Sequence, residues 1–178
     1  MRIITGTARG MALTTLEGEA TRPTLAKVKE ALFSILNDRM WGSRVLDLFS
    51  GTGNLGIEAL SRGAAECVFC DSSRDSLRLI KSNIAHCKAQ EGARVIPGDF
   101  RKTLMNLEGQ FDIIILDPPY GKGFLEPAFE LIRDQGLLAE DGVIVAEHRK
   151  EEDLHEEFFG FEKIKERKYG IIKLSIYC

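Results

Sequence analysis

Short apolar runs alternate with segments of helical periodicity from about residue 44 to the end of the chain. The apolar runs predict seven β-strands, over Val45–Phe49, Glu66–Cys70, Arg94–Ile96, Phe111–Leu116, Gly142–Glu147, Phe161–Arg167 and Ile171–Tyr177. The segments with helical spacing predict α-helices over Leu55–Arg62, Ser73–Lys88 and Phe124–Arg133. Repeated strand–helix units predict an α/β fold with a doubly wound, mostly parallel, seven-stranded sheet. Gly170 is a turn signal between the last two strands and predicts a closing antiparallel pair.

Residues 1–43 depart from this alternation. Arg2–Thr5 and Met11–Thr15 predict a small hairpin, and Leu25–Asp38 has the apolar spacing of one helix. Thr24, which follows Arg22-Pro23, is the expected N-cap of that helix. The chain therefore divides into an accessory hairpin and helix over residues 1–43 and an α/β domain over residues 44–178.

Length and composition match one globular domain with a short extension. The chain has 178 residues, of which 44% are hydrophobic and 29% charged, so it needs neither a metal nor disulfides to hold a core. No run approaches the ~18 apolar residues of a membrane span, and the N-terminus lacks a secretory signal, so we expect a cytosolic protein. Cys67 and Cys70 resemble a metal-binding pair, but three residues apart on a strand they face opposite sides. We interpret them as buried thiols and expect no metal site.

The charges are unevenly distributed along the chain. The net charge is -3, but residues 1–44 carry seven Lys and Arg against four Asp and Glu. A second basic cluster lies near the C-terminus and consists of Lys163, Lys165, Arg167, Lys168 and Lys173. Both segments are candidates for phosphate contacts, although solvated surfaces carry similar runs without any partner.

The first strand of the α/β domain leads into a glycine-rich loop. Gly51, Gly53 and Gly56 fit the G-x-G-x-x-G pattern between a strand and a helix, where a ligand approaches the backbone and an anion meets free N–H groups. Asp71 ends the second strand, where its carboxylate can accept hydrogen bonds from ribose hydroxyls. These features fit a nicotinamide dinucleotide as well as an adenosyl cofactor.

Acidic residues that follow the strands distinguish between these two candidate cofactors. Asp47 lies beside the glycine loop, where a carboxylate repels a pyrophosphate but can hold a cationic amino group. Asp99 offers an acceptor for an adenine amine, and Phe100 an aromatic ring beside it. An acidic pocket favours S-adenosylmethionine, which carries an ammonium and a sulfonium. The predicted cofactor-binding residues are Asp47, Ser50, Gly51, Gly53, Asn54, Asp71, Ser72, Asp99 and Phe100.

The tetrapeptide Asp117-Pro118-Pro119-Tyr120 follows the most apolar strand and is the predicted catalytic turn. Two prolines fix the backbone and remove two N–H donors, so the turn presents carbonyls and one carboxylate. An exocyclic amine of a nucleobase is a poor nucleophile because its lone pair is delocalised into the ring. Acceptors at Asp117 Oδ and the Pro118 carbonyl can bond both amine hydrogens and favour a pyramidal nitrogen, while Tyr120 stacks on the base.

These motifs together resemble those of a known family. Met1–Gly6, Arg22-Pro23-Thr24, Val45–Gly53, Glu58–Ala64 and Asp117–Tyr120 are similar to the bacterial RsmD family of class I methyltransferases. The resemblance covers essentially the whole chain. It implies methyl transfer from S-adenosylmethionine to the N2 amine of one guanine in 16S ribosomal RNA, within the small subunit or its precursor.

Substrate contacts are expected outside the cofactor site. Residues 1–43 are a candidate RNA-contact region, and the predicted substrate-binding residues are Arg9, Arg22, Thr24 and Lys122. Arg22 and Thr24 also fit cofactor binding or simple capping, and Glu147 fits either a supporting role or solvent exposure. The alternative functions are an adenine-N6 methyltransferase of DNA or RNA, a nicotinamide-linked oxidoreductase, and a ribosome-assembly factor with a dormant site.

Overall fold

A single eight-stranded sheet runs through the computed structural model, which describes residues 1–15 and 23–178. The strands are β1 (Arg44–Asp47), β2 (Glu66–Asp71), β3 (Ala93–Pro97), β4 (Phe111–Leu116), β5 (Leu138–Arg149), β6 (Glu157–Phe158), β7 (Phe161–Tyr169) and β8 (Ile172–Tyr177). Their order is β3-β2-β1-β4-β5-β8-β7-β6. Strands β1 to β5 pair in parallel, and β8 pairs antiparallel with both β5 and β7. The predicted doubly wound α/β class is confirmed.

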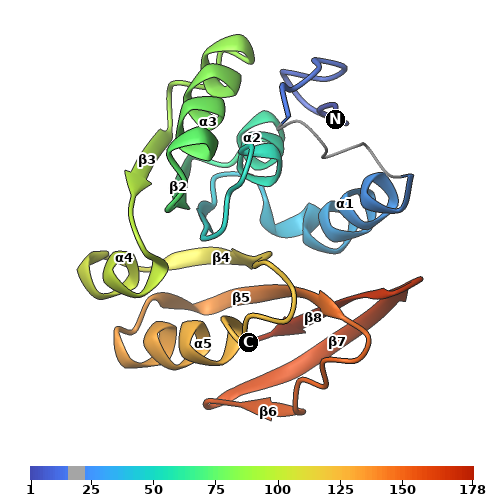
Figure 1. The fold of residues 1–178 in the computed structure, drawn as a ribbon, viewed down its shortest axis with the longest axis vertical. Coiled ribbons are helices and arrows are strands. Elements are labelled where there is room, and N and C mark those ends of the chain that lie inside the picture. Colours follow the sequence, from blue (N-terminus) through green and yellow to red (C-terminus); the bar gives the residue numbers. More distant parts are fainter. Residues whose placement is uncertain (16–22) are drawn as a thin grey trace.

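Helices cover both faces of the sheet (Figure 1). They are α1 (Pro23–Leu36), α2 (Asn54–Ser61), α3 (Arg74–His86), α4 (Phe100–Asn106) and α5 (Leu125–Asp134), with a 3-10 turn at Asn37–Arg39. Helices α1, α2 and α3 pack on one face, where Leu32 and Ile57 belong to the same buried cluster as Val45 of the sheet. Helices α4 and α5 pack on the other face, where Phe129 and Leu46 share a second cluster.

Three elements of the α/β domain differ substantially from the predictions, while the other predicted bounds there lie within two residues of the observed ones. The sheet gains an eighth strand, β6, because two residues are too short a run to show periodicity. Helix α4 was missed for the same reason, since it has only seven residues. Strand β5 begins at Leu138 rather than Gly142, because the acidic pair Glu140-Asp141 before Gly142 looks like a turn in sequence although the chain is already extended there.

The N-terminal prediction is also modified. Residues 1–15 hold one antiparallel bridge, between Arg2 and Ala12, in place of two paired strands. Helix α1 already includes Pro23, as proline favours the first helical position. Thr24 therefore lies inside the helix and is not its N-cap, and Arg22 lies outside the described residues.

The N-terminal segment is anchored on α2 by a buried carboxylate. Glu58 is fully buried and accepts the backbone N–H groups of Ile4 and Thr5, at 2.8 and 3.0 Å. It also pairs with Lys29 of α1 at 2.7 Å and with Arg62 at 2.8 Å. Burial opposes ionisation of Glu58, but Lys29 and these donors hold the pKa of the carboxyl below its ordinary value. The anchor joins residues 1–15, α1 and the α/β domain into one unit.

The cysteines lie as predicted. Cys67 and Cys70 are free and buried, and they belong to the clusters on opposite faces of the sheet. Among residues 1–15 and 23–178, no cluster of His, Cys, Asp or Glu side chains has the arrangement of a metal site. Within the same residues no helix combines the length and apolar character needed to cross a bilayer.

Candidate active site

Three acidic residues lie at or just beyond the ends of the central strands. Val45 pairs with Ile113 and Asp47 with Ile115, and Ile115 in turn pairs with Val145. Because side chains alternate along a strand, Asp117 and Glu147, two residues further on, emerge on the same face as Asp47. The sheet changes its direction of winding between β1 and β4, which is where α/β sheets form their ligand crevices. The predicted catalytic turn and the glycine loop are thus neighbours.

Asp47 is a buried carboxylate with one oxygen unsatisfied. Its Oδ2 accepts the N–H of Gly56 at 3.0 Å, whereas Oδ1 is buried and has no hydrogen-bond partner among the described residues. Burial is the main cause that raises the pKa of Asp47 to about 7, and the negative charge of Asp71 adds to it. An unpaired buried oxygen is costly, so this oxygen is a candidate acceptor for a donor group of a ligand.

The glycine loop is shaped by two left-handed residues. Gly51 has φ +56° and Gly53 has φ +78°, a conformation that other residues adopt only with strain. A Cβ placed on Gly51 would meet no atom of the described chain within 4 Å, so the loop leaves open space there. Asp71 holds the loop, because its Oδ2 accepts the N–H of Gly51 at 2.9 Å and its Oδ1 that of Ser73 at 2.8 Å. Each carboxylate oxygen retains a further lone pair for a ribose hydroxyl.

Several predicted cofactor residues already serve the fold. Ser50 donates to the carbonyl of Asp47 and accepts from the N–H of Cys70, so its hydroxyl ties β1 to β2. Asn54 accepts a hydrogen bond from Lys29 at 2.6 Å. Ser72 is exposed beside Asp71. Whether these side chains also touch a cofactor stays a prediction.

The predicted adenine contacts lie at the start of α4. Asp99 caps this helix by accepting the N–H of Arg101 at 3.0 Å, and its side chain remains exposed. Phe100 is only 5% exposed and packs between Phe49 and Phe124, with ring centroids 5.1 and 5.2 Å away. Phe49 retains more accessible surface than Phe100, so a ring stacked at this point meets Phe49 more readily.

The predicted catalytic turn follows β4 and is held by residues at and just beyond the end of β5. The hydroxyl of Tyr120 donates to Oε1 of Glu147 at 2.6 Å. Glu152 accepts the N–H of Gly121 at 3.1 Å and that of Arg149 at 3.0 Å. A cavity of about 260 Å³ lies on this side of the turn, and the residues that line it include Pro119, Tyr120, Phe124, Asp153 and Phe158. This volume is slightly below the range of about 300–1,000 Å³ that is usual for small-molecule pockets.

The predicted substrate residues are less closely grouped. Lys122 is exposed on the loop that follows Tyr120. Arg9 is exposed next to Ala8, whose N–H donates to Ser61 at the C-terminal end of α2, whereas the glycine loop lies at the opposite end of that helix. The side chains of Arg22 and Thr24 are not among those described.

Sequence reasoning missed Asn83, which links the N-terminal segment to the glycine loop. Its amide accepts the N–H of Thr14 and donates to the carbonyls of Thr14 and Thr52, all within 3.0 Å. Asn83 is 1% exposed although it sits on a largely polar helix. An amide on the apolar stripe of α3 was the only local signal of this role.

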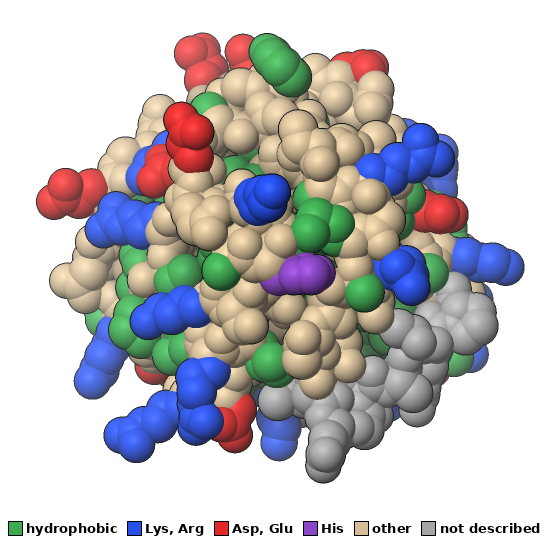
Figure 2. All heavy atoms as spheres, turned by 90° about the horizontal axis from the view of Figure 1, so that it is seen from above, with side chains coloured by type: hydrophobic (Ala, Val, Ile, Leu, Met, Phe, Trp, Pro, Cys, Tyr) green, Lys and Arg blue, Asp and Glu red, His purple; other side chains and the backbone are tan. Residues whose placement is uncertain are grey.

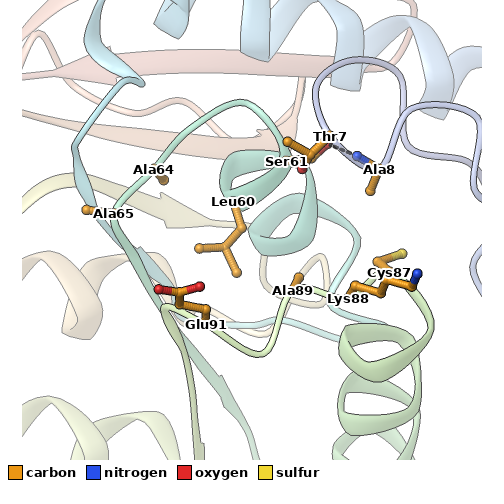
Figure 3. Close-up of a pocket in the computed structure, with 10 residues that line it drawn as sticks. All are labelled: Thr7, Ala8, Leu60, Ser61, Ala64, Ala65, Cys87, Lys88, Ala89 and Glu91. Atoms are coloured by element: carbon orange, nitrogen blue, oxygen red, sulfur yellow. Dashed lines mark hydrogen bonds between the residues drawn. The ribbon is translucent and has the colours of Figure 1, made fainter.

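A second cavity lies away from the predicted catalytic turn. It measures about 310 Å³ and is lined by the C-terminal end of α2, the segment after α3 and residues Thr7 and Ala8 (Figure 3). None of the predicted catalytic or cofactor-binding residues lines it.

The topology and the arrangement at the ends of β1 and β4 define a class I methyltransferase fold. The sequence matches the protein family described as Conserved hypothetical protein 95 over residues 1–178. The chain therefore belongs to this family, the RsmD family. YlbH of Bacillus subtilis (strain 168) is 39% identical over 180 residues, which cover 99% of this chain and 98% of that protein.

Two further relatives agree with this assignment. Ribosomal RNA small subunit methyltransferase D of Haemophilus influenzae is 35% identical over 181 residues, covering 99% of this chain and 93% of that protein. The solved structure of yhhF from Escherichia coli superposes with a TM-score of 0.90 at 31% identity, covering 99% of this chain and 96% of that one.

Proposed function

We propose that the protein transfers a methyl group from S-adenosylmethionine to the exocyclic N2 amine of a guanine in small-subunit ribosomal RNA. The observation that carries the proposal is the row of Asp47, Asp117 and Glu147 at the ends of adjacent strands, with the glycine loop beside it. The relative from H. influenzae is named a small-subunit ribosomal RNA methyltransferase over nearly the same length.

The residues present fit S-adenosylmethionine. Oδ1 of Asp47, which has no partner within residues 1–15 and 23–178, suits a donor such as an ammonium group. The open space over Gly51 admits a ligand close to the backbone. Asp71 has lone pairs left for ribose hydroxyls. The cofactor supplies an electrophilic methyl group on a sulfonium.

The chain itself orients the acceptor amine. The Asp117 carboxylate and the Pro118 carbonyl accept the two hydrogens of the amine, so the nitrogen becomes pyramidal and its lone pair faces the methyl group. Transfer of the methyl group to this nitrogen would break its bond to the cofactor sulfur, which would leave as a neutral thioether. The methylated nitrogen would then be acidic and would release one proton to Asp117 or to water. No separate general base is required.

Contacts to the rest of the RNA are assigned to the N-terminal segment. Figure 2 shows the face where this segment and the end of α3 lie, and Lys and Arg side chains are spread around it. The C-terminal basic cluster contributes less, because Lys163 and Lys173 pair with Glu166 at 3.3 and 2.8 Å. Phosphate contacts of this kind position an RNA but do not specify a base.

The test is methyl transfer from labelled S-adenosylmethionine to small subunits that lack the modification, followed by nucleoside analysis. We expect N2-methylguanosine from the wild-type protein and a loss of ~10²-fold or more in rate for Asp117→Ala, with cofactor affinity within a few-fold. Glu140→Gln is the control and should leave the rate unchanged. Glu140 is exposed and lies near the start of β5, at the opposite end from Glu147. N6-methyladenosine as the product, or no transfer at all, would refute the proposed function.

A further inference from the structure

Glu147 is buried at the active site but lies outside the motifs that point to the chemistry. It is 6% exposed and ends the core of β5, and its hydrogen bond to Tyr120 joins residues 27 positions apart. Among the described residues, neither Lys nor Arg forms an ion pair with it. A buried carboxylate without a cationic partner costs stability, so packing alone does not account for it.

The hydrogen bond between Glu147 and Tyr120 restrains the last residue of the catalytic turn. Pro118 and Pro119 restrict the backbone up to Tyr120, but they leave the χ angles of the Tyr120 ring free. The 2.6 Å hydrogen bond to Glu147 fixes the outer edge of that ring, while the Arg149 guanidinium lies 5.2 Å from the ring centroid. The ring is thus held at its hydroxyl and approached by a cation on one of its faces.

We propose that Glu147 is a positioning residue, which acts through the Tyr120 hydroxyl to hold the ring where the acceptor base stacks. This inference rests on the proposed function for the identity of the base. Glu147 does not touch the reacting atoms. Burial and the Glu147 charge both raise the pKa of Tyr120, so the phenol stays protonated and remains the donor in this pair.

A double-mutant cycle in the same methyl-transfer assay tests the coupling. Tyr120→Phe and Glu147→Leu should each lower kcat by about 10-fold, the effect of losing one hydrogen bond to a charged group. The double variant should be no slower than either single variant, because both changes remove the same contact. Glu147→Gln keeps an acceptor for the hydroxyl and should stay within a few-fold of wild type. The dissociation constant for S-adenosylmethionine should be unchanged throughout.

Two results would overturn the inference. Wild-type kcat in Glu147→Leu shows that Tyr120 needs no support, and multiplicative losses in the double variant show that Glu147 acts by another route. Glu140→Leu, at the far end of the same strand, controls for general effects of an apolar substitution on β5. Thermal melting of each variant separates misfolding from mispositioning.

A measurement that needs no activity separates this inference from the proposed function. The protein has three tyrosines, so ¹⁹F NMR of fluorotyrosine-labelled protein resolves Tyr120, assigned through Tyr120→Phe. Glu147→Leu should shift the Tyr120 resonance and lower its phenol pKa toward the ordinary value, while Glu147→Gln retains a restrained ring. An unchanged Tyr120 resonance and titration in Glu147→Leu refutes the positioning role even if the wild-type protein methylates no RNA.

Discussion

The buried carboxylate of Asp47 makes folding stability depend on pH in a defined window. Burial raises its pKa from 3.8 to about 7 in the folded protein. A group whose pKa is raised on folding contributes stability that is fully present below the unfolded value and is lost as pH rises through the folded value. The window therefore runs from about pH 4 to about pH 7. Asp47→Asn removes this titration but keeps an acceptor for the Gly56 N–H.

The size of the effect follows from the same shift. Each pH unit inside the window changes the contribution of Asp47 by about 1.4 kcal/mol. Between pH 5 and pH 7 the wild-type protein should lose about 2 kcal/mol of stability relative to Asp47→Asn, because Asp47 is already half ionised at pH 7. Other titrating groups, such as Glu147 and Glu166, are common to both proteins and cancel in the difference.

Urea unfolding followed by circular dichroism at pH 5, 6, 7 and 8 measures this difference. The gap in unfolding free energy between the two proteins should change steadily up to pH 7 and then level off. Asp75→Asn, an exposed residue in the first turn of α3, is the control for removing a carboxylate and should run parallel to wild type. If Asp47→Asn also runs parallel to wild type from pH 5 to pH 7, the Asp47 carboxylate is not desolvated in the folded protein and the argument fails.

Three further predictions concern the cofactor, the substrate and the anchor. Asp71→Ala should weaken S-adenosylmethionine binding by at least ~10-fold in calorimetry, because two charge-assisted hydrogen bonds to the ribose and the hydrogen bond to the Gly51 N–H are lost. An affinity equal to that of the Asp75→Asn control would mean that the ribose binds elsewhere. Initial rates of methyl transfer, measured at one salt concentration, should be higher on purified small subunits than on naked 16S ribosomal RNA, because selectivity must come from RNA shape and from an easily flipped base. Equal rates would contradict recognition of RNA shape but would not contradict the proposed chemistry. Gly6→Ala should lower the free energy of unfolding measured in urea by more than ~1 kcal/mol, since Gly6 has φ +89° and a Cβ would lie 1.7 Å from the carbonyl oxygen of Ser61. An unchanged free energy of unfolding would mean that residues 1–15 do not pack on α2 in solution.

The sequence alone predicted the features that local patterns control. Phe111–Leu116 was placed with its observed bounds, because a run of branched apolar residues has few alternatives to a buried strand. The glycine pattern and the Asp117–Tyr120 turn were found for a similar reason, since the required backbone conformations restrict which residues fit. Short or polar elements, such as α4 and the start of β5, gave too few apolar positions to show a period.

The tertiary structure decided which distant residues meet. The position of β8 between β5 and β7, the burial of Asp47 and the contact of Tyr120 with Glu147 all depend on strand register. Periodicity along the chain shows which side chains are buried but not against what, because burial depends on pairings between segments far apart in sequence. The sequence therefore determined which polar side chains follow the strands, while the packing of β1, β4 and β5 determined that Asp47, Asp117 and Glu147 lie at the ends of adjacent strands.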